Sequence, residues 1–155
     1  MSWTARYRTA QVLLTITVLE FFGPILRDTG DTHLLNPEWV GHARFHLAWM
    51  LVFMGLSGLC CLALIWGHHP RQGRLSHLYI AWMWQACNIF GFWGAAALES
   101  SYDGMVVDPH FHFTVFGLNE NIAAFIGLTT VLTASMVWLK WGVEPWTYGR
   151  DGGAA

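Results

Sequence analysis

An uninterrupted run of 21 uncharged residues, LAWMLVFMGLSGLCCLALIWG at positions 47–67, constrains this chain more than any other feature. A helix needs about 20 mostly apolar residues to cross the hydrocarbon core of a bilayer. Stretches of this kind occur at 9–26, 45–67, 75–98 and 117–139. With short connections they take up residues 1–155. The sequence therefore predicts an all-α, four-helix transmembrane bundle that forms a single integral membrane domain.

Composition supports a chain that lies in lipid. Hydrophobic side chains make up 54% of the residues and charged ones only 12%, too few to cover an ordinary soluble surface. The net charge of −2 argues against binding to nucleic acid. We therefore expect the lipid bilayer to be the main surrounding of the protein.

The N-terminal stretch has two interpretations. Arg6 and Arg8 before an apolar run are typical of a signal peptide, but no small-residue cleavage site follows, and Glu20 is poor chemistry for such a segment. We therefore expect an uncleaved first helix that is kinked near Pro24.

The distribution of Lys and Arg predicts the orientation. With the N-terminus inside, six basic residues fall on the inner side and two on the outer side, which favours N-in, C-in. The inner residues are Arg6, Arg8, Arg71, Arg74, Lys140 and Arg150, and the outer ones are Arg27 and Arg44. Most histidines and acidic residues then share the outer side. We expect a bacterial inner-membrane protein whose polar site faces the periplasm or the outside.

Two Pro-containing pairs predict where the even-numbered helices begin. Asn36-Pro37 and Asp108-Pro109 each place a good N-cap before a proline, which is tolerated at the first helical position. Both helices would then enter the membrane from outside with histidines in their first turns.

Helical spacing predicts which polar side chains can meet. His42 and His46 are four residues apart and share a face that Trp49 continues. His112 and Asn119 are seven apart on the last helix, with Glu120 beside them. Glu20 falls at a comparable depth in the first helix.

These residues define a predicted site at the outer half of the bundle. Candidate metal ligands are His42, His46 and His112, because imidazole is a common ligand of transition metals. Candidate acid or base groups are Glu20, His46 and Glu120, and candidate substrate contacts are Asn88, Asn119 and Trp49. The alternative is structural. A histidine pair on a helix is often only hydrogen-bonded, and amides such as Gln85 and Asn88 often join helices.

The segment NPEWVGHARFH at 36–46, together with four spans, resembles small uncharacterised bacterial integral membrane proteins in which an HARFH-like segment opens the second helix. The resemblance rests on His42, Arg44 and His46. It implies the architecture and no activity.

Three classes of function remain open. The first is a small membrane enzyme that acts on a lipid, isoprenoid or other apolar molecule by acid/base or metal-assisted chemistry. The second is a non-catalytic membrane subunit or small-molecule carrier. The third class is a haem or electron-transfer subunit, which needs histidines that face one another across a porphyrin. It ranks lowest because the histidines near the predicted helix starts do not form such pairs. The sequence leaves the substrate, the cofactor and the oligomeric state open, with a transition metal ion as the candidate cofactor.

Overall fold

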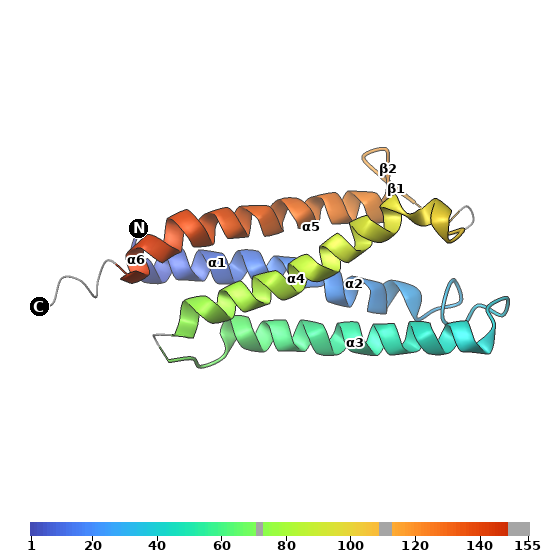
Figure 1. Ribbon diagram of the computed structural model, residues 1–155, viewed down its shortest axis with the longest axis horizontal. Helices are drawn as coiled ribbons and strands as arrows, with labels where there is room; N and C mark the ends of the chain where they lie inside the picture. Colours follow the sequence, from blue (N-terminus) through green and yellow to red (C-terminus); the bar gives the residue numbers. More distant parts are fainter. Residues whose placement is uncertain (71–72, 109–112, 149–155) are drawn as a thin grey trace, which may run out of the picture.

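Long helices run side by side through the chain, which confirms the all-α class (Figure 1). The computed structural model describes residues 1–70, 73–108 and 113–148, and it is 76% helical. The helices are α1 Trp3–Thr17, α2 Leu19–Asp28, α3 Gly41–Trp66, α4 Arg74–Ala97, α5 Glu120–Val137 and α6 Glu144–Tyr148. A six-residue π-helix, Trp138–Val143, joins α5 to α6, and a 3-10 turn, Glu99–Ser101, follows α4.

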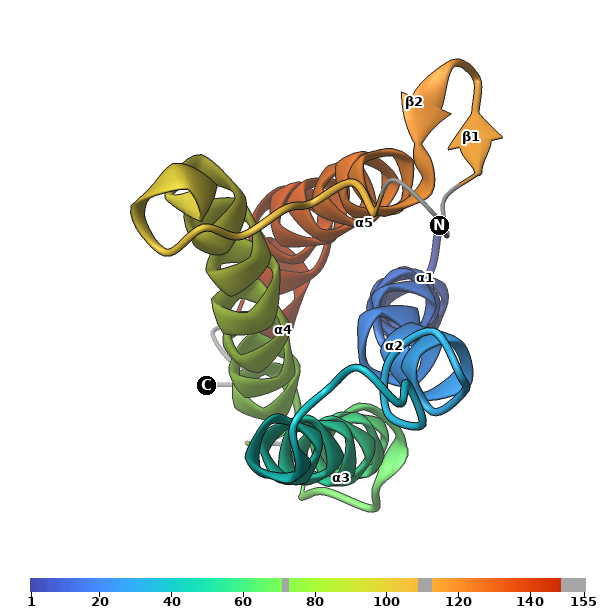
Figure 2. The same cartoon turned by 90° about the vertical axis from the view of Figure 1, so that its right-hand side faces the viewer.

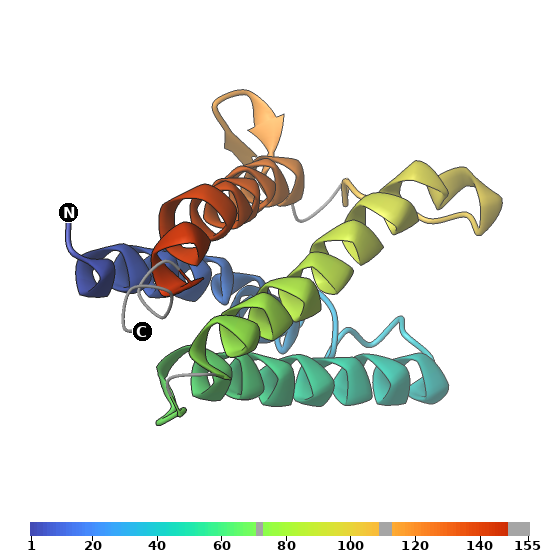
Figure 3. The ribbon, with the colours of Figure 1, turned by 60° about the vertical axis from the view of Figure 1, so that its left-hand side comes forward.

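The helices surround a common axis in an up-and-down order. Viewed along that axis, α3 and α5 lie at opposite corners, with α1 and α2 on one side and α4 on the other (Figure 2). α4 starts beside the end of α3 and diverges from it along its length (Figure 3). The start of α1 and the end of α6 meet, since Trp3 Nε1 donates to Thr147 Oγ1 at 3.2 Å. The start of the first helix and the end of the last helix therefore lie at the same end of the bundle.

In the described residues, three helical stretches are long and apolar enough to cross a membrane: Trp3–Asp28, Gly41–Trp66 and Glu120–Thr147. α4 coincides in position and length with the third predicted span, 75–98. Its polar and aromatic residues, such as Gln85 and Asn88, explain why it is less apolar than the others. α4 nevertheless packs against α1, α3 and α5.

Buried side chains from every long helix form one core. Its largest fully buried members are Leu14, Phe21, Ile65, Leu78, Ile89 and Leu139. At Gly58 the helices α2 and α3 approach closely, because a Cβ there would lie 2.7 Å from Cζ of Phe22. Glycine at this position thus lets α2 pack directly against the backbone of α3.

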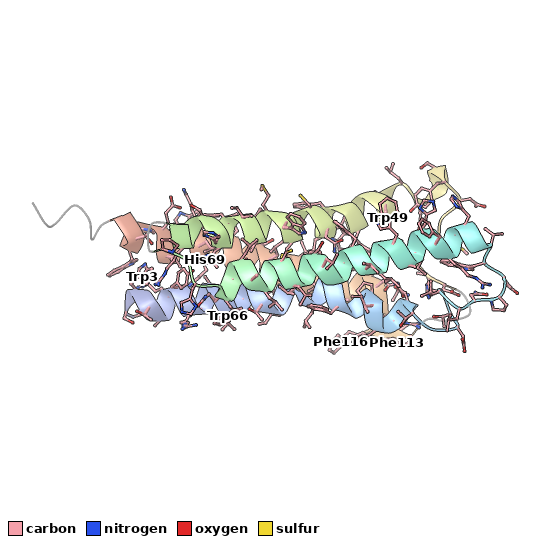
Figure 4. The ribbon with its side chains drawn as sticks, turned by 90° about the horizontal axis from the view of Figure 1, so that it is seen from below. Trp3, Trp49, Trp66, His69, Phe113 and Phe116 are labelled. Carbon is pink, nitrogen blue, oxygen red and sulfur yellow. The ribbon has the colours of Figure 1, made fainter. Side chains whose placement is uncertain are left out.

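Tryptophan side chains fasten the helices to one another through their indole N–H groups. Trp66 donates to Thr15 Oγ1 at 2.8 Å, Trp82 to Leu132 O at 2.9 Å and Trp138 to Arg6 O at 2.9 Å. Trp3 and Trp66 lie toward the end of the bundle that holds the chain ends, and Trp49 lies toward the other (Figure 4). The indole ring can thus remain among apolar groups while its N–H group makes a hydrogen bond.

The predicted helix start at Asn36-Pro37 is wrong. The Asn36 side chain accepts a hydrogen bond from Glu38 N at 2.9 Å, which makes a local turn, and α3 begins at Gly41. The carbonyl oxygen of Asn36 also accepts from Arg44 Nη2 at 2.8 Å. Arg44 therefore ties this turn to α3.

The expected start of the last helix at Asp108-Pro109 is also wrong. A two-stranded antiparallel hairpin, β1 Thr114–Val115 and β2 Leu118–Asn119, precedes α5, which begins at Glu120. Its turn holds Phe116 at φ 52° and Gly117 at φ 80°. Asn119 caps α5, since its side chain accepts from Asn121 N at 2.9 Å. Glycine favours the turn because it adopts positive φ without steric cost.

The first helical stretch, Trp3–Asp28, has a one-residue turn at Val18 between α1 and α2, six residues before the predicted kink at Pro24. Thr17 Oγ1 donates to Leu14 O at 2.9 Å, a local hydrogen bond that competes with regular helix geometry. Pro24 lies inside α2 and provides no N–H for the carbonyl of Glu20, one turn earlier. Both effects act on the segment that carries Glu20.

Candidate functional site

The histidines predicted as metal ligands lie on the outside of α3. His42 and His46 are exposed, and their Nε2 atoms are 3.0 Å apart. Trp49 is 63% exposed, with its ring centroid 6.1 Å from that of His46. The third predicted ligand, His112, lies outside the described residues. Within residues 1–70, 73–108 and 113–148, no three His, Cys, Asp or Glu side chains are placed to hold a metal ion.

Glu120 and Asn119 form a separate polar group at the start of α5. Asn119 Nδ2 and Phe113 N donate to Glu120 Oε2 at 2.9 and 3.1 Å, and Arg27 Nη2 lies 3.8 Å from Glu120 Oε1. Glu120 thus faces α2 and the hairpin. The exposed histidine pair belongs to α3, at the opposite corner of the bundle from α5 (Figure 2). The structure therefore does not bring His46 and Glu120 together.

Glu20 has a different environment, because it lies inside the bundle. Its side chain is 2% exposed. In the described part of the chain, neither carboxyl oxygen has a hydrogen-bond partner and no ion pair involves Glu20. The Asn88 amide on α4 lies beside this carboxyl. Of the predicted site residues, Glu20 and Asn88 are thus brought together from different helices.

A second polar contact lies one helical turn away from the first. Thr17 Oγ1 and Gln85 Oε1 share a short hydrogen bond, and both residues are 0% exposed. Thr17 is three residues before Glu20, and Gln85 is three residues before Asn88. Because residues three apart are neighbours on a helix, the two contacts form a ladder between the first helix and α4.

α3 contributes a third wall to this interior. Ser57 is 2% exposed and its Oγ has no hydrogen-bond partner among the described residues. Cys61, four residues further along the same face, is fully buried and lies close enough to Glu20 to interact electrostatically. Gln85 Nε2 is a further buried atom without a described partner. We call Thr17, Glu20, Ser57, Gln85 and Asn88 the inner polar group.

Two members of the inner polar group were missed by reasoning from the sequence. Thr17 and Ser57 are small hydroxyl residues inside apolar runs, where such residues usually bond to their own helix. The available signal was spacing: Thr17 lies one turn before Glu20, as Gln85 lies one turn before Asn88. It could have indicated that the two helices face each other along these pairs.

The inner polar group combines one carboxylate with neutral hydroxyl and amide groups. An ionisable side chain inside a membrane span is costly unless it is paired or faces a polar cavity, and such residues mark ion pathways and proton relays. A carboxylate beside hydroxyl and amide oxygens is also the type of donor set that hard cations prefer. The chemistry therefore suits a proton or a small cation.

No protein-family model matches this chain, and neither the curated proteins nor the solved structures give a significant match. The site is therefore interpreted from its own residues.

Proposed function

We propose that this protein is an integral membrane carrier that binds a small monovalent cation, H⁺ or Na⁺, at Glu20 inside its helix bundle. The single observation that carries this proposal is the position of Glu20, which is 2% exposed, makes no ion pair among the described residues and has only the Asn88 amide beside its carboxyl group. A single buried carboxylate carries one negative charge, which one monovalent cation neutralises.

The oxygen atoms around Glu20 support this ligand class. Asn88 places its amide group beside the carboxyl, where its N–H can donate to the carboxylate, and Ser57 provides a buried hydroxyl without a described partner. The backbone carbonyl oxygen of Glu20 is a further candidate ligand for the cation, because Pro24 has no N–H to bond to it. Such hard oxygen donors favour Na⁺ or a proton over a soft metal.

The turn at Val18, between α1 and α2, supports transport as the role of this ion. Membrane carriers often bind their ions where a spanning helix is broken near the middle of the bilayer. Glu20 lies about 12 Å along the helix from Asp28, at 1.5 Å per residue, and directly after the turn at Val18. A movement of α2 against α1 would change access to Glu20 from one side.

Ion flux into vesicles tests this function. We would reconstitute the full chain in liposomes with a trapped pH-sensitive dye, impose a potassium diffusion potential with valinomycin, and repeat the measurement with ²²Na⁺. We expect the wild type to take up H⁺ or Na⁺ faster than empty vesicles do, and Glu20→Gln to reduce the rate to that background.

Glu38→Gln is the matched control, because Glu38 is an exposed carboxylate in the connection before α3. It should transport as the wild type does. Equal transport by wild type and Glu20→Gln, or no transport above background with either ion, would overturn the proposal.

A second candidate is the membrane enzyme predicted from the sequence, with an apolar substrate. A groove of about 580 Å³ between α4 and α5 favours it, lined by Trp93, Ile126, Thr129, Thr130, Thr133, Ala134 and Val137. Its threonine hydroxyls donate to backbone carbonyls of α5, so the groove presents mainly apolar atoms. Mass spectrometry of lipids that copurify with wild type and with Thr133→Trp, which fills the groove, would identify an isoprenoid or acyl ligand.

We further propose that the protein lies in a bacterial inner membrane with both chain ends in the cytoplasm. The excess of Lys and Arg on the side of the bundle that holds the chain ends supports this orientation. The resemblance to small four-helix bacterial membrane proteins supports the compartment.

A further inference from the structure

The histidine pair on α3 is a second polar feature that the inner polar group does not include. His42 and His46 both have exposed side chains, and their rings meet with centroids 4.5 Å apart at an angle of 87°. The two Nε2 atoms point at each other at 3.0 Å. Both rings thus present the same nitrogen to one point outside the helix.

That separation matches the spacing of two nitrogen ligands on one metal ion. Zn–N bonds are about 2.0–2.1 Å long, so two of them at about 90–110° place the nitrogens roughly 2.9–3.4 Å apart. The observed 3.0 Å therefore allows chelation with little movement of either ring. Residues four apart on a helix hold this geometry because they lie one above the other.

The surroundings leave the other coordination positions open. Phe45 and Trp49 are the neighbouring rings, with centroids 6.0 and 6.1 Å from that of His46. Both are exposed, so this part of α3 is open on its outer side. In the described ranges this surface provides two ligands, and a four-coordinate metal needs two more. Water or the same histidine pair of a second copy can provide them.

We propose that His42 and His46 chelate a divalent transition metal ion, Zn²⁺, Ni²⁺ or Cu²⁺, through their Nε2 atoms. Imidazole nitrogen is a ligand that all three ions accept. On binding, the metal takes the place of the proton in the hydrogen bond between the two Nε2 atoms. The ring that donated this proton carries it on Nδ1 instead, so both imidazoles stay neutral and coordinate through Nε2. The site is independent of ion binding at Glu20.

Metal binding by the purified full chain tests this assignment. The protein in detergent is first stripped with EDTA, then titrated with Zn²⁺ in competition with a chromophoric indicator. We expect His42→Asn and His46→Asn each to weaken Zn²⁺ binding by 10-fold or more. Cu²⁺ bound to the wild type should show nitrogen coupling in its EPR spectrum, and the double variant should lose it.

His68→Asn is the matched control, because His68 is exposed at the other end of α3. It should bind Zn²⁺ as the wild type does, and Glu20→Gln should do so too. One metal per chain would indicate water in the remaining positions, and one per two chains would indicate a second copy. The proposal fails if the wild type binds no metal, if both histidine variants bind as the wild type does, or if His68→Asn causes the same loss.

Discussion

The hydrogen bond between Thr17 and Gln85 joins two side chains that are completely buried inside the bundle. A buried polar group that loses its partner costs about 1–3 kcal/mol, whereas replacing both partners by apolar groups can be almost neutral. In membrane bundles such pairs average nearer 0.6 kcal/mol. The pair therefore serves mainly to fix which faces of α1 and α4 meet, at the level of Glu20.

Thr17→Val should destabilise the protein by about 1–2 kcal/mol, because it keeps the shape of the side chain and leaves the Gln85 amide without a partner. Reversible unfolding in mixed detergent and SDS micelles, followed by circular dichroism, measures this change.

The double variant Thr17→Val with Gln85→Met tests the cause. It should cost less than the sum of the single variants, because no buried amide is then left alone. Strict additivity of the two costs would show that the pair makes no mutual contribution.

At the scale of the element, the length of each helix was predictable and its orientation was not. The predicted spans 45–67 and 75–98 differ by only a few residues from Gly41–Trp66 and Arg74–Ala97, because the length of an apolar run can be read from the sequence. α3, however, is apolar all round, and such a helix does not indicate which side faces its neighbours. Its buried face runs through Leu47, Leu51 and Cys61. His46 lies about 100° around the helix from Leu47 and is exposed.

The inner polar group shows the same limit on prediction. Glu20 and Asn88 were recognisable from the sequence, since polar residues in apolar runs stand out. Their contact depends on which faces of the first helix and α4 meet, and the sequence does not give this orientation. The hairpin before α5 was missed because Asp108-Pro109 satisfies the rules for a helix start equally well.

The contact between α2 and α3 should be sensitive to the size of residue 58. Gly58→Ala would place its Cβ 2.7 Å from the Phe22 ring, so we expect a loss of stability of about 1–3 kcal/mol from overpacking. The same unfolding assay measures it.

Gly127→Ala is the matched control on α5, since nothing lies within 4 Å of a Cβ there. It should be neutral or slightly stabilising. Adding Phe22→Leu to Gly58→Ala should restore part of the loss. Equal effects of the two glycine substitutions would contradict the close contact.

The hairpin 113–119 should depend on Glu120. Because its carboxylate accepts hydrogen bonds from Phe113 N and Asn119 Nδ2, Glu120→Ala should loosen the connection before α5 and increase protease cleavage there several-fold. Limited proteolysis with mapping of the fragments measures it. Glu99→Ala is the control. It also removes a carboxylate that accepts a hydrogen bond from a backbone N–H at the same end of the bundle, but it should not increase cleavage within 113–119.

At the scale of the whole molecule, apolar side chains cover much of the outer surface. Phe53, Leu56, Leu59 and Phe90 are all more than half exposed. Soluble monomers rarely expose large contiguous apolar patches, and a hydrocarbon surrounding removes the cost of doing so. The molecule therefore combines an apolar exterior with a mainly apolar core that holds a few buried polar side chains.

Cysteine labelling in intact cells tests the orientation. In a background with Cys60, Cys61 and Cys87 replaced by Ala, Glu38→Cys and Ser101→Cys should react with an impermeant maleimide, because both positions are exposed at the end proposed to face outward. His68→Cys should react only after the cells are opened. The reverse pattern would assign the opposite orientation.

The hydrogen bond between Trp3 and Thr147 makes this chain suitable for circular permutation. Because the first and last helices meet at 3.2 Å, a short linker could join them, and new termini could be opened in the connection between Gly67 and Gly73. That connection lies at the same end of the bundle (Figure 1). Every helix would then keep its direction across the membrane, although α4 would be synthesised first and α3 last.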